Sequence, residues 1–103
     1  MAWTYLMIAG LLEIGWAIGL KYTEGWTKLW PSVLTVITMI ASMYCLAIAV
    51  RSIPIGTGYA IWTGIGAAGT AALGIMLFGE SASAYRVGCI ALIVAGVIGL
   101  KAA

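Results

Sequence analysis

The chain has no histidine, aspartate, asparagine or glutamine among its 103 residues, and only 8% of its residues are charged. Without histidine, neither a Ser-His-Asp nor a Cys-His nucleophile can be assembled, and histidine-ligated metal sites are excluded. An average soluble domain carries about 25% charged residues, so this chain cannot cover a water-facing surface. We therefore expect neither an enzyme nor a metalloprotein, and we expect no cofactor.

Positive charge is also scarce and is spread along the chain. Five Lys and Arg residues against three Glu residues give a net charge of +2. This pattern lacks the basic cluster that contacts nucleic acid, so no nucleic-acid partner is expected. The two cysteines, Cys45 and Cys89, each lie inside an apolar run and do not make a disulfide framework.

Hydrophobic residues are abundant: they make up 64% of the chain, and its mean hydropathy is +1.14. A helix needs about 20 apolar residues to cross a bilayer, and in lipid the backbone must satisfy its own hydrogen bonds. Charged and turn-forming residues separate four runs of sufficient length. The sequence predicts an all-α membrane protein, a single multi-pass domain over residues 1–103, with spans at about 3–21, 29–50, 54–78 and 84–101.

The basic residues give almost no orientation signal. In a four-span topology, Arg51 and Lys101 lie on one side of the membrane, and Lys21, Lys28 and Arg86 lie on the other. Loops rich in Lys and Arg normally stay on the cytoplasmic side, and here the balance is nearly even. Insertion in both orientations, and hence an antiparallel dimer of identical chains, becomes possible.

Small residues mark two of the runs. They allow helices in a membrane to approach closely. In the fourth run they favour a face for self-association over packing within one chain. In the third run they are compatible with either a bend or a tight crossing. The fourth-run residues are Gly88, Ala91, Ala95, Gly96 and Gly99, and the third-run residues are Gly64, Gly66 and Gly69.

Glu13 is the only charged residue in the middle of any run. An acidic side chain at the centre of a membrane helix costs roughly 2.5–3.5 kcal/mol on insertion scales, and such residues usually mark transport or proton pathways. A structural carboxyl group is the alternative, but Ser or Thr would serve that purpose. The sequence therefore favours a functional Glu13.

Helical spacing predicts the surroundings of Glu13. Gly10 and Trp16 share its helix face, so we expect Gly10 to leave open volume and the Trp16 indole N–H to reach the carboxylate. Ser42 provides a hydroxyl group in the middle of the second run. Tyr59 and Trp62 lie on one stripe of the third run, where they can line a polar cavity.

A carboxylate among aromatic rings suits a weakly hydrated or delocalised cation. Because the chain lacks the usual transition-metal ligands, an organic cation is the expected ligand. Met39 and Met43 lie one turn apart on the second run. They are expected either to line a flexible opening toward lipid or simply to face the lipid.

Four segments resemble the small multidrug resistance family: EIGW (13–16), TEGWTKLWPS (23–32), IPIGTGYAIWTGIG (53–66) and AGVIGLK (95–101). The resemblance covers essentially the whole chain. Within the family, Gly10, Trp16 and Thr63 are most similar to the guanidinium-exporting branch. Departures from the common pattern are Gly15, Gly58 and Cys89.

The resemblance implies an antiparallel, dual-topology homodimer with one site that contains Glu13 of both subunits. It also implies that guanidinium, and small substituted guanidinium ions, exchange for protons across the inner (plasma) membrane at the paired carboxylates. The site residues that carry over are Glu13, Trp16, Ser42, Tyr59 and Trp62, beside the branch-specific Gly10 and Thr63, with Gly88, Ala95 and Gly96 as candidate dimer contacts.

Two other functions remain open from the sequence. A proton-coupled exporter of quaternary ammonium or bulkier cationic drugs would use the same carboxylate, although Trp16 occupies part of the volume that a large drug needs. A non-transporting membrane assembly subunit or a small channel would not need Glu13 beside aromatic residues.

Overall fold

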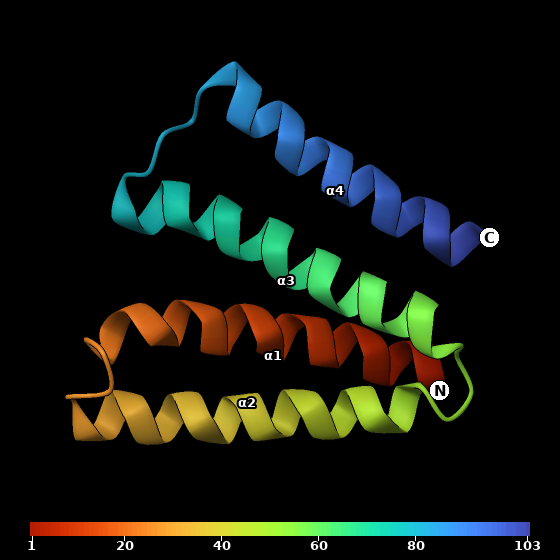
Figure 1. Ribbon diagram of the computed structural model, residues 1–103, viewed down its shortest axis with the longest axis horizontal. Helices are drawn as coiled ribbons and strands as arrows, with labels where there is room; N and C mark the ends of the chain where they lie inside the picture. The colour runs from red at the N-terminus through yellow and green to blue at the C-terminus, as the bar shows by residue number, and fades with distance from the viewer.

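The computed structural model describes residues 1–103 and consists of four helices (Figure 1). They are α1 (Ala2–Tyr22), α2 (Leu29–Ala49), α3 (Ile55–Phe78) and α4 (Ala84–Ala102). Each helix is long and apolar enough to cross a membrane. The predicted all-α architecture with four candidate membrane helices is confirmed.

The helices form a single layer rather than a closed bundle. They lie side by side in the order α2, α1, α3, α4 (Figure 1). The molecule measures 39 × 35 × 16 Å, and its thinnest dimension is little more than the diameter of one helix, about 10–12 Å. Only 15 of the 103 residues are buried, and α4 contributes none of them. A layer this thin leaves large apolar faces uncovered by the chain itself.

The best-packed region lies where α1, α2 and α3 meet. Its buried apolar residues include Leu6, Ala49 and Ile61. A polar junction joins the same three helices: the Ser42 hydroxyl of α2 donates to the Ala9 carbonyl of α1 at 2.7 Å and accepts from the Trp62 indole of α3 at 3.0 Å. These bonds fix how the three helices are placed relative to one another.

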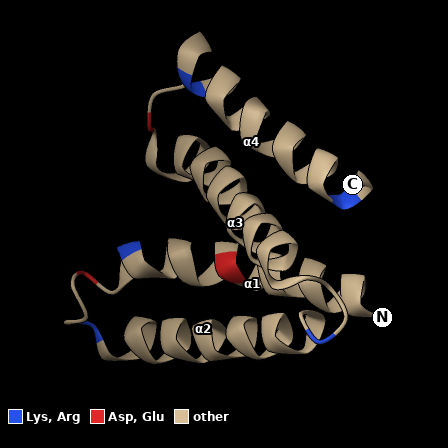
Figure 2. Ribbon diagram, turned by 45° about the vertical axis from the view of Figure 1, so that its right-hand side comes forward, with Lys and Arg blue, Asp and Glu red and all other residues tan.

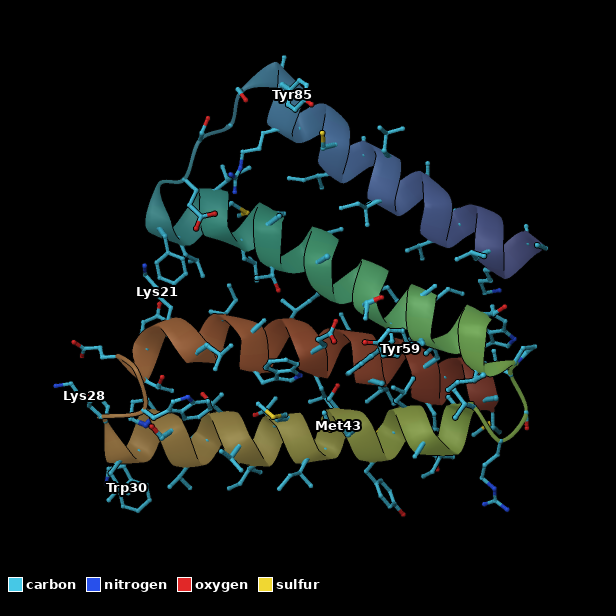
Figure 3. All side chains as sticks on the ribbon, viewed as in Figure 1. Lys21, Lys28, Trp30, Met43, Tyr59 and Tyr85 are labelled. Atoms are coloured by element: carbon cyan, nitrogen blue, oxygen red, sulfur yellow. The ribbon has the colours of Figure 1, made fainter.

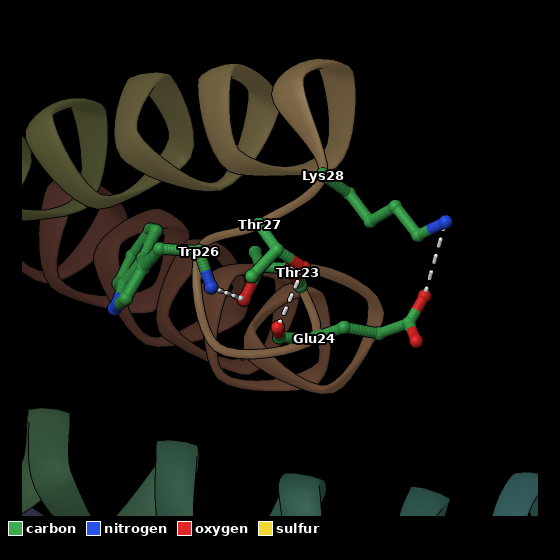
Figure 4. Close-up of polar contacts among 5 residues, drawn as sticks. All are labelled: Thr23, Glu24, Trp26, Thr27 and Lys28. Carbon is green, nitrogen blue, oxygen red and sulfur yellow. Dashed lines mark hydrogen bonds and ion pairs between the residues drawn. The ribbon is translucent and has the colours of Figure 1, made fainter.

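The loop between α1 and α2 is closed by its own hydrogen bonds (Figure 4). The buried Thr23 donates through its hydroxyl to the Leu20 carbonyl at 2.8 Å and accepts from the Trp26 amide at 3.3 Å. The backbone takes positive φ angles at Glu24, Gly25 and Trp26, which reverses the chain direction within a few residues. This tight loop is why α1 and α2 pack along their whole length.

The third helix runs without interruption through its glycines, from Ile55 to Phe78. The glycines instead admit side chains of neighbouring helices. A Cβ at Gly64 would collide with Val97 of α4, and one at Gly69 would collide with Ile14 of α1. These close contacts are the tight crossing that the small residues of the third run predicted.

Candidate functional site

Glu13 lies halfway along α1 and is only 8% exposed. Figure 2 shows it as the one acidic segment within a helix, whereas the other charges lie at helix ends and in loops. Its carboxylate takes part in neither of the two ion pairs of the chain. It lies directly against Gly66 of α3, at the position that a side chain there would occupy. The absence of a side chain at Gly66 therefore leaves the space that the Glu13 carboxylate occupies.

A cavity of about 700 Å³ opens beside Glu13, between the C-terminal halves of α1 and α3. These two helices diverge toward the end of the molecule that holds the α1–α2 and α3–α4 loops (Figure 1). The lining includes helix-face residues of α1, helix-face residues of α3 and one residue of the α3–α4 loop. The residues that carry chemistry in it are Glu13, Trp16, Lys21, Thr63, Thr70 and Glu80.

Trp16 lines the cavity with Glu13, as the shared helix face predicted. However, its indole Nε1 is buried without a hydrogen-bond partner, so the expected bond to the Glu13 carboxylate is absent from the single chain. Spacing along a helix determines which side chains share a face but not the direction of an N–H bond. A buried donor without an acceptor is costly, which makes Trp16 an incomplete part of this site.

Ser42 and Trp62 bind each other instead of Glu13. Ser42 is completely buried and its hydroxyl is used in the three-helix junction described above, so it makes no bond to the Glu13 carboxylate in the chain. The Trp62 ring packs against Tyr59 with centroids 5.5 Å apart and planes tilted by 56°. Tyr59 is 54% exposed and extends from α3 beside α1 (Figure 3). Neither aromatic residue lines the cavity.

The expectation that Gly10 leaves open volume is wrong. Gly10 is buried, and a Cβ there would lie 2.8 Å from Cγ2 of Ile65. The Ile65 side chain of α3 already fills the space next to Gly10. The glycine therefore permits close packing of α1 on α3 and contributes no room for a ligand.

Two threonines of α3 line the cavity, and only Thr63 was expected there from the sequence. Thr63 donates its hydroxyl to the Tyr59 carbonyl at 2.9 Å, which leaves its lone pairs free to accept. Thr70 has a buried hydroxyl oxygen with no partner at all. Its signal was present in the sequence, because Thr63, Gly66, Thr70 and Gly74 follow one helix face at intervals of three and four residues.

The other predicted residues lie away from the cavity. Met39 is partly buried on α2. Met43 is 51% exposed on the same helix (Figure 3), and neither methionine lines a cavity of the chain. Gly88, Ala95 and Gly96 are exposed on α4, and nothing lies within 4 Å of a Cβ built at either glycine. The small-residue face of α4 is thus free for contact with another helix.

Comparison with known proteins decides the family. The model of the Small Multidrug Resistance protein family matches residues 1–93. The chain belongs to the small multidrug resistance family. Its membrane helices and family membership indicate a multi-pass membrane transporter rather than an enzyme.

Several proteins named Guanidinium exporter are similar to this chain over nearly their whole length. The Guanidinium exporter of Yersinia pseudotuberculosis serotype I (strain IP32953) is 60% identical over 103 residues, which are 100% of this chain and 99% of the relative. The Guanidinium exporter of Proteus vulgaris is 59% identical with the same coverage. That of Escherichia coli (strain K12) is 60% identical over 101 residues, covering 98% of this chain and 96% of the relative.

Proposed function

We propose that this chain is a proton-coupled antiporter that exports guanidinium, and small substituted guanidinium ions, across the inner (plasma) membrane. The observation that carries the proposal is Glu13, the only charged side chain in the middle of any span, at the inner end of an open cavity. The relatives named Guanidinium exporter support the choice of cation, since they match over the full length.

The donors and acceptors of the cavity suit guanidinium. This ion is planar, always charged and carries only N–H donors, and two parallel N–H groups match one carboxylate. Glu13 supplies the carboxylate. The hydroxyl oxygens of Thr63 and Thr70 supply further acceptors, and that of Thr70 is buried without a partner. The Thr70 oxygen lacks a donor and guanidinium offers only donors, so the two are complementary.

A second copy of the chain is proposed to complete the site. An ion of four heavy atoms displaces on the order of 100 Å³, a few times the 30 Å³ of a water molecule, whereas the single-chain cavity is about 700 Å³ and open. Trp16 has a buried N–H without an acceptor, and the exposed small residues of α4 have no partner within the chain. An antiparallel homodimer would bring a second Glu13 to the same cavity and would use the even distribution of Lys and Arg.

Coupling follows from competition at the paired Glu13 carboxylates. No other charged group lies in the middle of a span, and the charged residues near the span ends are all basic, so the same oxygens must hold either protons or the cation. A cation that binds on one side displaces protons, and protons that bind on the other side displace the cation. Exchange of the inward-open and outward-open roles between two antiparallel subunits then carries each ligand across.

The size of the cavity favours one alternative, an exporter of quaternary ammonium or bulkier cationic drugs. Sites for drug-sized ligands occupy about 300–1,000 Å³, a range that includes this cavity as it stands in one chain. The volume that remains after dimerisation distinguishes the two functions.

Purified protein in proteoliposomes tests the proposal directly. Under an imposed pH gradient, external guanidinium should drive proton movement in the wild-type protein and should drive none in Glu13→Gln, which keeps the shape of the side chain without its charge. Glu24→Gln is the matched control, because Glu24 is exposed in a loop and pairs with Lys28 outside the cavity.

A bulky aromatic quaternary cation forms the second arm of this experiment. Preference for that cation over guanidinium would replace the proposed substrate with the alternative. Guanidinium-driven proton movement that persists in Glu13→Gln would overturn the central role of Glu13. No substrate-driven proton movement with either cation would favour a non-transporting subunit.

A further inference from the structure

The cavity contains a second carboxylate, and its placement repeats that of the first. Glu80 follows the end of α3 and its side chain folds back over Gly74, in the position that a Cβ would occupy. Glu13 lies in the same way over Gly66. The two glycines are eight residues apart on one helix, or about 12 Å at 1.5 Å per residue. Both carboxylates line the same cavity, Glu13 at its inner end and Glu80 at its mouth.

The fold of the chain after α3 produces this placement. Gly79 takes a left-handed backbone conformation with φ 65°, which ends the helix, and the Glu80 amide donates to the Gly74 carbonyl at 3.3 Å. The chain thus turns back on the helix end and directs Glu80 toward the cavity.

Glu80 already holds a guanidinium group, that of Arg86. The distance from Nη2 of Arg86 to Oε1 of Glu80 is 2.9 Å. The pair lacks the two parallel N–H···O bonds that a guanidinium group and a carboxylate can form. Only one nitrogen of Arg86 is engaged, and its buried Nε has no partner. The two side chains are 42% and 46% exposed, and ion pairs this exposed contribute little to stability. Such a pair can be exchanged at small cost.

Thr70 lies between the two carboxylates. It is four residues from both Gly66 and Gly74 on the cavity-lining face of α3, and its hydroxyl oxygen is buried without a partner. Acceptors therefore follow one another along α3 from the mouth to Glu13, at intervals of roughly 6 Å. A cation made only of N–H donors finds an oxygen at every helical turn.

We propose that Glu80 is a second cation site at the mouth of the cavity, where guanidinium exchanges with the side chain of Arg86 on its way to or from Glu13. The identity of the cation rests on the proposed function. A free guanidinium ion forms the two parallel bonds to a carboxylate that Arg86 does not form here. Arg86 keeps Glu80 neutralised when the site is empty and moves aside when the cation arrives.

Lys21 favours exchange over simple accumulation of cations. Its Nζ lies 5.8 Å from the centroid of the Phe78 ring at the same mouth, and it pairs with no carboxylate (Figure 3). Lys21 and Arg86 together carry more charge than Glu80, so the mouth has a net positive charge. It therefore does not attract cations unless Arg86 moves away from Glu80.

The two arginines of the chain provide a direct readout, since they are only Arg51 and Arg86. Full-length protein labelled with ¹⁵N-arginine in bicelles is titrated with guanidinium chloride while the Nε–Hε signals are followed by NMR. We expect a saturable shift of the Arg86 signal, with Arg51 as the internal reference. Sodium chloride at equal concentration controls for screening, and urea controls for the neutral planar shape.

Two variants separate the mouth from the central site. The Arg86 shift should persist in Glu13→Gln, which lacks the central charge, and should be lost in Glu80→Gln. Equal shifts with sodium chloride, or loss of the shift in Glu13→Gln, would overturn the proposal. The binding experiment does not depend on transport, so a protein that fails to transport guanidinium but retains the Arg86 shift refutes the proposed function alone.

Transport kinetics provide a second test, in which two variants should change the KM for guanidinium in opposite directions. Glu80→Gln should raise the KM for guanidinium about threefold to tenfold, and Arg86→Gln should lower it by up to about fivefold, with kcat less affected in both. Glu24→Gln, which removes an ion-paired carboxylate from the neighbouring loop outside the cavity, should change neither constant. If Glu80→Gln and Arg86→Gln both lower kcat and leave KM unchanged, the pair is structural and the proposal fails.

Discussion

The carboxylate of Glu13 occupies the position that a side chain at Gly66 would need, so the acid in the membrane and the bare surface of α3 are a matched pair. The match explains how a charged residue at mid-span packs at 8% exposure without an ion-pair partner. It also makes a glycine on another helix as important to the site as the acid itself.

Gly66→Ala should therefore inactivate the protein. The added methyl group displaces the Glu13 carboxylate, and overpacking of this kind costs typically about 1–3 kcal/mol. We expect loss of guanidinium-driven proton movement in proteoliposomes and a lower unfolding midpoint in detergent. Gly56→Ala on the same helix is the control, because nothing lies within 4 Å of a Cβ there. Full activity in Gly66→Ala would show that the position of Glu13 is not critical.

The junction at Ser42 should be cooperative. Ser42→Ala leaves the buried indole N–H of Trp62 without its acceptor, and the loss of such a partner costs about 1–3 kcal/mol. Trp62→Phe removes the donor and part of the ring. If the bond matters, the double variant should be less destabilised than the sum of the two single variants in unfolding measurements. Strict additivity would mean that Ser42 acts mainly through its bond to the Ala9 carbonyl.

The four helices could be predicted from the sequence because the apolar runs are long, with Glu13 as the one charge in the middle of any of them, and the turns carry their own signals. Gly79 and Ser83, for example, end α3 and cap the start of α4. The face of α1 with Glu13 and Trp16 was predictable for the same reason, since spacing alone determines which residues of one helix share a face.

The opposite wall of the cavity could not be predicted, because spacing does not reveal how two helices are rotated against each other. The stripe of α3 with Tyr59 and Trp62 was expected beside Glu13, whereas the stripe with Gly66 and Thr70 lines the cavity. That choice depends on packing contacts such as Ile65 at Gly10. The return of Glu80 over the helix end depends on one backbone conformation at Gly79.

Trp16 should control the size of the cation. Trp16→Gly removes a large side chain from the cavity beside Glu13, so we expect weaker guanidinium transport and less rejection of larger cations in competition assays. Trp16→Phe keeps an aromatic ring but removes the indole N–H, so it separates the effect of volume from that of hydrogen bonding. Because this N–H has no partner within the chain, the stability of the fold should change by less than about 1 kcal/mol. Unchanged selectivity in folded Trp16→Gly would mean that Trp16 only packs.

The uncovered face of α4 should hold the dimer together. Gly96 is exposed, with open space where a side chain would project, and small residues permit the close approach of membrane helices. Gly96→Leu should reduce the dimer fraction in bicelles, measured by cross-linking or single-molecule photobleaching, and Gly96→Ala should largely retain it. An unaltered dimer in Gly96→Leu would locate the contact on another face.

Orientation in the membrane should be mixed, because Lys and Arg are nearly balanced between the two sides. Two lysines added after Ala103 should bias the chain toward one orientation, since basic residues near a span end stay on the cytoplasmic side. An antiparallel dimer needs both orientations, so this variant expressed alone should lose most of its transport activity. Coexpression with a partner biased the opposite way should restore the dimer. If that partner retains Glu13, transport activity should also return, and if it carries Glu13→Gln, activity should stay absent. Labelling of single cysteines introduced into the loops, on a background without Cys45 and Cys89, measures the orientation directly. A wild-type chain labelled from one side only would rule out the antiparallel dimer.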